Sequence, residues 1–140
     1  MKKGYCGDDC NYCPRYLATQ SGDEERFAEV AAMWRIVGWR DTEELPEKLA
    51  CHGCASVKIC GLGIRECVIA KGIDTCGECT DYSCQKLREI FANNEKEAAI
   101  CKEKLSKEDY KLFQLAFFSK KERLDEINKN ILNNLKNSLP

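Results

Sequence analysis

The chain has 140 residues and a formal net charge of −1, and 44% of its residues are hydrophobic, a share that includes 11 cysteines. This length fits one domain, or one domain with an appended helical segment, and argues against two full domains. No stretch approaches the roughly 20 uninterrupted apolar residues of a membrane span, and no apolar signal core follows the first residues. We therefore expect a soluble, cytoplasmic protein whose thiols are reduced or metal-bound, with a disulfide framework as the alternative for an oxidising location.

Two kinds of sequence meet near Cys84. Residues 1–84 are rich in Cys and Gly, whereas residues 85–140 contain no Gly and are dominated by helix-forming residues. The first region carries 10 basic and 14 acidic side chains, and the second carries 12 and 9. We expect a Cys-rich metal-binding region (1–84) and a helical segment (85–140) that together form one domain. The acidic first region argues against a nucleic-acid ligand, because phosphate contacts need clustered Lys and Arg.

Helices are predicted at several places along the chain. Ser21 and Glu24 form a capping box, which predicts a helix from Ser21 that ends at Gly38. Its predicted buried face consists of Phe27, Val30, Ala31, Trp34 and Val37. A short helix is predicted for Ile64–Lys71, ending at Gly72, and a longer one from about Ser83. The longer helix would turn inward Leu87, Ile90, Phe91 and Ala98.

The C-terminal region contains two further capping boxes. Ser106 with Asp109 predicts a helix that bears Tyr110, Phe113 and Phe117. Ser119 with Glu122 predicts a last helix that bears Leu124, Ile127, Ile131 and Leu135. No convincing strand is found. The predicted fold is mainly α: a small metal-stabilised Cys-rich region of knuckles and short helices, packed on a C-terminal helical segment.

Ten of the cysteines lie within residues 1–84, and six of them form three C-x-x-C pairs. This spacing lets a tight turn direct two thiolates at one metal ion. The candidate ligands are Cys6, Cys10, Cys13, Cys51, Cys54, Cys60, Cys67, Cys76, Cys79 and Cys84. Two tetrahedral zinc sites would use eight of them, and a bridged cluster with shared thiolates is also compatible with the number. Chain order leaves open which cysteines share a metal.

Several residues near the cysteines have a predicted structural role. The glycines beside or between cysteines are expected to provide positive φ or a close approach in knuckle turns: Gly7, Gly53, Gly61 and Gly77. We interpret His52, the only histidine, as an exposed loop residue, and Asp8 and Asp9 as helix-start or solvated residues. We expect Trp34 and Trp39 to lie in the core or in the wall of a cleft. The aromatic run 112–118 is expected to form a core helix, and Cys101 is expected to be a buried thiol.

Iron is the alternative metal. Thiolates bind iron clusters as readily as zinc, and Cys13-Pro14 is similar to the Cys-Pro of ferredoxins. The spacing of Cys6, Cys10 and Cys13 also resembles the cluster motif of radical SAM enzymes, but the chain is too short for their barrel. We therefore expect zinc, with an iron–sulfur or thiol redox protein as the alternative.

The order of the motifs resembles a known family. The motifs are Cys6-Gly7, Cys10, Cys13-Pro14, Cys51-x-Gly53-Cys54, Ile64-Arg65-x-Cys67, Lys71-Gly72, Cys76-x-x-Cys79 and Tyr82-Ser83-Cys84-x-Lys86-Leu87. Together they resemble the small cysteine-rich prokaryotic family called domain of unknown function 3795, over about the first 90 residues. The resemblance implies a cytoplasmic bacterial or archaeal protein that binds metal. The family has no established activity that the resemblance could extend to this chain. Two positions depart from the family pattern. Gly61-Leu62-Gly63 follows Cys60 in place of a C-x-x-C pair, which weakens the prediction that Cys60 is a metal ligand. Ser83 stands where the family usually has a Pro.

The sequence favours a structural zinc protein that presents a surface to an unknown protein or small-molecule partner. Its metal would hold together loops that otherwise could not offset their loss of conformational entropy. We find no nucleophile–base pair and no Gly-rich phosphate loop, so no catalytic constellation supports an enzyme.

Overall fold

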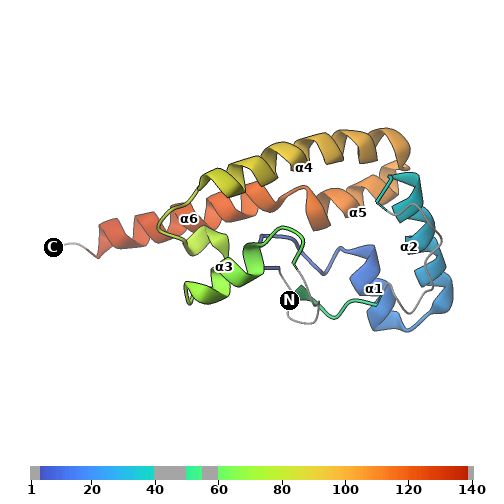
Figure 1. Ribbon diagram of the computed structural model, residues 1–140, viewed down its shortest axis with the longest axis horizontal. Coiled ribbons are helices and arrows are strands. Elements are labelled where there is room, and N and C mark those ends of the chain that lie inside the picture. The colour runs from blue at the N-terminus through green and yellow to red at the C-terminus, as the bar shows by residue number, and fades with distance from the viewer. Residues whose placement is uncertain (1–3, 40–49, 55–59, 139–140) are drawn as a thin grey trace.

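The computed structural model describes residues 4–39, 50–54 and 60–138. Within these ranges the chain is helical and has no strand, which confirms the mainly α prediction. The elements, shown in Figure 1, are α1 (Pro14–Ser21), α2 (Glu24–Ile36), α3 (Ile64–Ala70), the short 3₁₀ helix η3 (Cys76–Glu78), α4 (Gln85–Lys104), α5 (Lys107–Phe117) and α6 (Lys120–Asn137). No helix in the described part of the chain is long and apolar enough to cross a membrane.

The start of α2 corrects the predicted capping box. Ser21 is the last residue of α1, which Gly22 terminates with φ of 69°. Helix α2 begins at Glu24, and the carboxylate of Asp23 accepts the backbone N–H of Glu25 at 2.9 Å. Asp23 is the N-cap because the chain must first leave α1 through the left-handed glycine. The predicted apolar face is otherwise correct, with Phe27 half-buried and the other four residues buried.

Helix α1 has no counterpart among the predicted elements. Its first residue is Pro14, which has a fixed φ suited to a first helical turn and directly follows Cys13. The helix buries Pro14 and Ala18, and its two turns are too few for an apolar pattern to repeat along the sequence. The signal that could have predicted it is the proline at the first helical position.

The three C-terminal helices and α3 agree with the predicted elements. Ser106 caps α5 by accepting the N–H of Asp109 at 3.2 Å, as expected. Ser119 precedes α6, but its hydroxyl donates to the carbonyl oxygen of Gln114 at 2.8 Å and makes no cap bond. The second capping box is therefore wrong in its chemistry, although the helix begins where it was expected.

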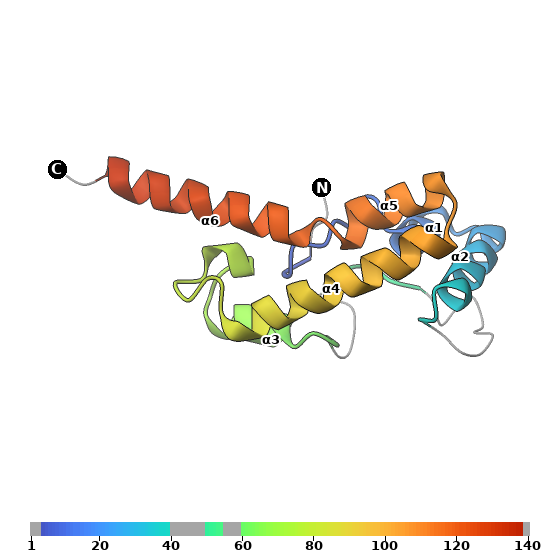
Figure 2. The ribbon, with the colours of Figure 1, turned by 90° about the horizontal axis from the view of Figure 1, so that it is seen from above.

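Helix α6 extends past the rest of the molecule toward the C-terminus (Figures 1 and 2). Leu124 near its start is fully buried, and Ile127 and Ile131 are half-buried. Leu135 was expected to face inward, but 57% of it is exposed, because no other described element reaches this far along the helix.

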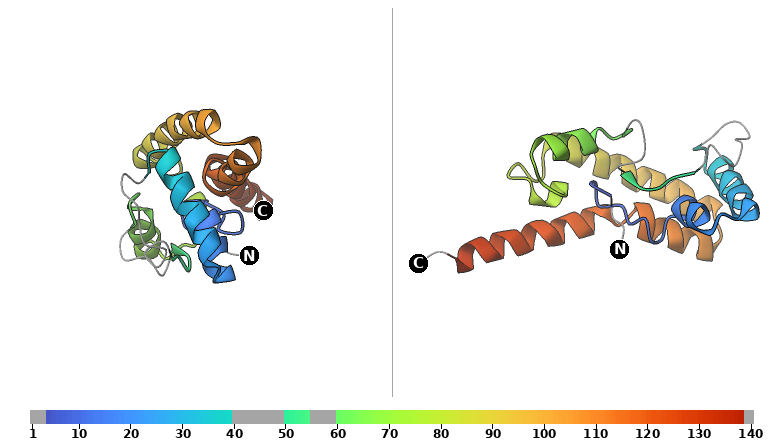
Figure 3. Two further views of the ribbon diagram at one scale, coloured as in Figure 1. Left: turned by 90° about the vertical axis from the view of Figure 1, so that its right-hand side faces the viewer. Right: turned by 90° about the horizontal axis from the view of Figure 1, so that it is seen from below.

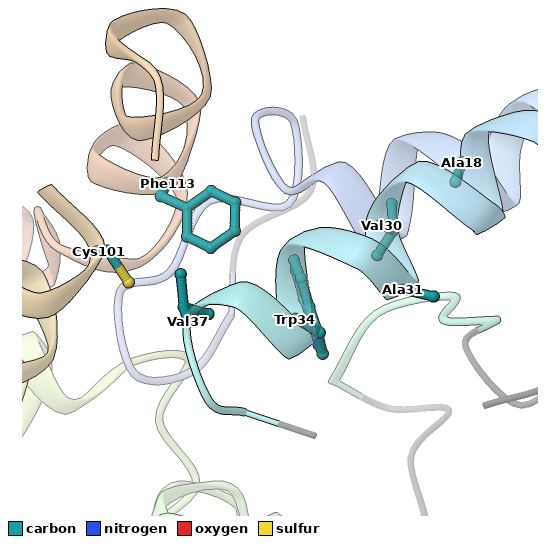
Figure 4. Packing of buried hydrophobic residues seen from close by; sticks show 7 residues of the cluster. All are labelled: Ala18, Val30, Ala31, Trp34, Val37, Cys101 and Phe113. Carbon is teal, nitrogen blue, oxygen red and sulfur yellow. The ribbon is translucent and has the colours of Figure 1, made fainter. Parts of the chain in front are cut away.

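Two hydrophobic clusters make up the core. The first joins α1, α2, α4 and α5 around Trp34 and Phe113; Figure 4 shows these two residues with Val37 and Cys101. Cys101 is fully buried, as predicted, and so is Phe113 from the aromatic run. The second joins the N-terminal loop, α3, α4 and α6, with these members: Cys6, Ile64, Val68, Leu87, Phe91 and Leu124. Each cluster contains residues from both sides of Cys84, so the two regions share one core.

Two glycines of the Cys-rich region rest directly on α6. A Cβ on Gly7 would lie 3.0 Å from the carbonyl oxygen of Lys120, and a Cβ on Gly77 would lie 2.8 Å from the Cβ of Ile127. The amide of Asn128 donates to the carbonyl oxygen of Gly77 at 3.1 Å. The view along the molecule in Figure 3 shows α4, α5 and α6 gathered beside the N-terminal loops. Helix α6 therefore positions both parts of the Cys-rich region.

Candidate metal sites

Four cysteines line a cavity of about 220 Å³ at the N-terminal end of the fold: Cys10, Cys13, Cys51 and Cys54. Cys10 and Cys13 belong to one turn, in which the N–H of Cys13 donates to the carbonyl oxygen of Cys10 at 3.2 Å. The turn is fixed to α5, because the N–H of Asp9 donates to the carbonyl oxygen of Ala116 at 3.0 Å. We call these four cysteines the N-terminal set.

Helix α1 brings the second half of the N-terminal set to the first. The N–H of Cys51 donates to the hydroxyl oxygen of Thr19 at 2.9 Å, and the guanidinium of Arg15 donates to the carbonyl oxygen of Ala50 at 3.4 Å. Gly53, between Cys51 and Cys54, has φ of 107°, a conformation that favours glycine. Two C-x-x-C pairs that are far apart in the sequence thus face one cavity.

Burial raises the pKa of three thiols of the N-terminal set: Cys10, Cys13 and Cys54. Desolvation raises the pKa of Cys10 to about 12 and that of Cys13 to about 11, and it also raises the pKa of Cys54. The neighbouring cysteines and the Asp8 carboxylate raise these pKa values further, because like charges disfavour a thiolate. A metal ion that binds here must displace protons.

A second set of four cysteines lines a smaller cavity of about 40 Å³: Cys67, Cys76, Cys79 and Cys84. We call it the C-terminal set. Cys67 lies on α3, Cys76 and Cys79 flank the η3 turn, and Cys84 directly precedes α4. Desolvation, followed by the charges of the other three cysteines, raises the pKa of Cys76 to about 11. Three helical elements thus converge on one small space.

Cys79 has hydrogen-bond donors of the kind that surround metal-bound thiolates. The ammonium of Lys71 lies 3.1 Å from its sulfur, and the N–H of Asp81 donates to the same sulfur at 3.4 Å. Such donors stabilise negative charge on sulfur. The sequence did not predict Lys71 as a neighbour of a cysteine sulfur. The available signal was the Lys71-Gly72 motif, which lies at the end of the helix that carries Cys67.

The other predicted ligands line neither cavity. Cys6 is 7% exposed within the second hydrophobic cluster, and burial strongly raises its pKa. Burial alone would raise the pKa of Cys60, but the backbone N–H groups of the four residues 62–65 together lower it. Cys101, which was not a predicted ligand, lies in the first cluster. Cys6 and Cys60 therefore lie outside the linings of both cavities, although both are near enough to Cys54 for their charges to interact with it.

The sulfur atoms of each set are not gathered around one point. Among residues 4–39, 50–54 and 60–138, no group of three or more His, Cys, Asp or Glu side chains is arranged to hold a metal ion. Coordination would therefore require the thiol side chains of each set to rotate toward one another. His52 is exposed, as predicted, and does not line either cavity.

Asp8 and Asp9 correct a prediction, because neither is a helix-start residue. Asp9 is 6% exposed, and its carboxylate accepts the backbone N–H and the side-chain amide of Asn11 at 3.0 and 2.8 Å. Asp8 pairs with the buried ammonium of Lys120 at 2.9 Å. Both line the N-terminal cavity. They were missed because acidic residues next to a predicted turn are usually solvated.

The remaining expectations for this region are mostly correct. Trp34 is buried and also walls the N-terminal cavity, as does the half-buried Trp39. Of the four glycines, Gly61 alone is wrong: it has neither a positive φ nor a close neighbour.

Known families give one match. The family model described as "Protein of unknown function (DUF3795)" matches residues 2–89, more than half of the chain, and this range contains both four-cysteine sets. Neither the curated proteins nor the solved structures contain a match to the chain. The shared motifs and the extent of this match show that the chain belongs to the DUF3795 family of proteins of unknown function.

Proposed function

We propose that the protein binds two zinc ions, each held by four thiolates, and that the metal has a structural role. The N-terminal set would hold one ion and the C-terminal set the other. A single observation carries this proposal: two separate cavities are each lined by four cysteines. Cys6 and Cys60 are then left outside both sites.

The chemistry of the donors supports zinc. Zinc sites built from four thiolates are closed and tetrahedral, with sulfur about 2.3 Å from the metal. The cavity of about 40 Å³ at the C-terminal set is of a size for one ion, and the Lys71 ammonium offsets part of the charge that four thiolates bring. The raised pKa of Cys76 opposes binding, because a metal ion must displace the proton of this thiol before the sulfur can coordinate it.

The proposed mechanism is linkage between folding and metal binding. Segment 50–54 is attached to α1 by two hydrogen bonds, and the η3 turn is a single 3₁₀ turn, so both depend on further interactions. Zinc binding contributes about 10–16 kcal/mol in zinc-finger peptides, enough to order such loops. The ordered domain would then present a surface to a protein or small-molecule partner.

The experiment is a count of metal ions per chain by element-resolved mass spectrometry on protein purified without oxygen. We expect two zinc ions in the wild type and one in each of Cys51→Ser and Cys76→Ser. Cys60→Ser is the matched control, because it also removes a half-buried thiol of the Cys-rich region, and it should retain two. Loss of zinc in the control, or an unchanged count in either test variant, would contradict the ligand sets.

An iron–sulfur protein remains the second candidate, for one reason. The N-terminal cavity, at about 220 Å³, is larger than a single ion requires, and four thiolates also suit an iron cluster. The same samples distinguish the two metals. Iron in place of zinc, with visible absorption that disappears in Cys51→Ser, would favour a cluster at the N-terminal set.

A further inference from the structure

The N-terminal cavity extends beyond its four cysteines. It also reaches the end of α2, where Trp34 and Trp39 lie, and the end of α5, where Phe117 lies. Its volume of about 220 Å³ exceeds the 150 Å³ or so of a cavity that holds benzene in another protein. A zinc ion bound by four thiolates at one side would leave room for a small organic group beside it.

Three aromatic rings line this remaining space at near-right angles to one another. The centroids of Trp34 and Trp39 lie 5.0 Å apart with an interplanar angle of 81°. Phe117 lies 5.4 Å from Trp39 and 6.1 Å from Trp34, each time at 75°. Three mutually perpendicular rings form a corner, an arrangement that can present ring faces to a ligand from more than one direction.

Trp39 is held in place at both its polar and its apolar side. Its indole N–H donates to a carboxylate oxygen of Glu97 at 3.0 Å, and its ring packs on Phe113 at a centroid distance of 5.3 Å. A carboxylate acceptor increases the electron density of the indole ring and so strengthens the attraction of its face for a cation. The ring is therefore fixed before any ligand binds.

The charges around the cavity favour a cation over an anion. Asp8 and Asp9 both line it, and Lys120 compensates only the first of them. The guanidinium of Arg15 also lines the cavity, where it donates to the carbonyl oxygen of Ala50, and its charge balances that of Asp9. Four thiolates around a divalent zinc ion add a charge of about −2. The cavity of the metal-loaded protein is thus anionic as well as aromatic.

We propose that the cavity bounded by Trp34, Trp39 and Phe117 binds a small alkylated ammonium group beside the N-terminal metal site. The proposal rests on the proposed function, since the filled metal site supplies the net negative charge of the cavity. Cation–π contacts attract quaternary ammonium groups, which carry their charge on an apolar surface and lose little hydration on entering an aromatic site.

The test compares choline with 3,3-dimethylbutan-1-ol, a neutral molecule of the same shape. The chain has two tryptophans, so their two indole N–H signals in a nitrogen-15 NMR titration report binding directly. The titration uses protein in which the zinc and iron content has been measured. We expect choline to bind at millimolar concentration and about tenfold more tightly than the neutral analogue. Equal affinity for the two molecules would overturn the proposal.

Two variants distinguish the contribution of the aromatic rings to choline binding from the contribution of negative charge. Trp39→Leu should weaken choline binding about tenfold. Asp9→Asn keeps an acceptor for Asn11 but removes the charge, so it should weaken choline severalfold and leave the neutral analogue unaffected. Tyr110→Leu is the control, because this half-buried aromatic residue packs against the same cluster but does not line the cavity. Equal losses in all three variants would indicate general destabilisation and would count against the proposal.

Further outcomes distinguish the source of the ammonium group, and they separate failure of this inference from failure of the proposed function. Nα-acetyl-trimethyllysine amide carries the same headgroup on a peptide, and tighter binding of it than of choline would identify a methylated protein as the source. If two zinc ions are present and neither headgroup binds, this inference fails while the proposed function stands. If choline is preferred in protein that holds iron in place of zinc, the inference stands and the proposed zinc-binding function fails.

Discussion

Gly77 lies at the contact between the η3 turn and α6, so its replacement by alanine tests how the Cys-rich region is held. The new Cβ would lie 2.8 Å from the Cβ of Ile127, 2.9 Å from its Cγ2 and 3.0 Å from the carbonyl oxygen of Leu124. All three atoms belong either to helix backbone or to a β-branched side chain with little freedom, so the turn and the helix must separate. The φ angle of Gly77 is not positive, and the effect is therefore steric.

We expect Gly77→Ala to lower the free energy of unfolding by about 1–3 kcal/mol, the usual cost of overpacking. For a chain of this length that corresponds to a decrease of roughly 3–10 °C in the melting temperature. The assay is urea and thermal unfolding of metal-loaded protein, followed by circular dichroism. Gly61→Ala is the control, because Gly61 has no neighbour within 4 Å and no positive φ, and it should be neutral or slightly stabilising. If the two variants unfold alike, the proposed contact with α6 does not hold the turn.

Two other predictions concern side chains of the C-terminal helices. Lys120→Met should lower the free energy of unfolding by about 2–4 kcal/mol in a urea titration, because the lysine side chain is only 5% exposed and its loss leaves the Asp8 carboxylate without its partner. Lys121→Met is the control. It removes an exposed ion pair on the same helix and should lower the free energy of unfolding by less than about 1 kcal/mol. Similar costs for these two variants would refute the interpretation of a buried pair. Ser106→Ala should lower the free energy of unfolding by about 1 kcal/mol, because the N–H of Asp109 loses its acceptor. Ser106→Asp supplies another capping acceptor and should be nearly as stable as the wild type. Equal stability of Ser106→Ala and the wild type would show that the cap contributes nothing.

The helices that could be predicted from the sequence are those with an apolar period, and a side-chain cap is not required, because α3, α4 and α6 have none. The helix after Ser106 has both, and its position was correct. Helix α1 is too short for a period, and α2 begins two residues after a glycine turn that displaces the cap from Ser21 to Asp23. In both places the local geometry of a turn, which composition does not encode, determines where the helix lies.

The candidate site was predictable in its donors but not in their grouping. Knuckle spacing predicted ten candidate ligands, and the eight cysteines that line the two cavities are among them. The pairing of Cys10 and Cys13 with Cys51 and Cys54 depends on α1, which carries Thr19 to the backbone of the second pair. Cys6 has a similar sequence context, but its side chain lies in the apolar cluster around Leu124. Tertiary packing, and not spacing, makes that distinction.

The regions that carry the two cysteine sets share a contact with α6, and this argues against two independent fingers. The N-terminal loop contacts α6 through Gly7, and the guanidinium of Arg123 donates to the carbonyl oxygen of Gly7 at 2.9 Å. The η3 turn contacts the same helix through Gly77, little more than one helical turn further along. Because both contacts bear on α6, a displacement of the helix at one of them changes the packing at the other. Metal binding at one set should therefore stabilise the other, which two separate zinc fingers joined by a linker would not do.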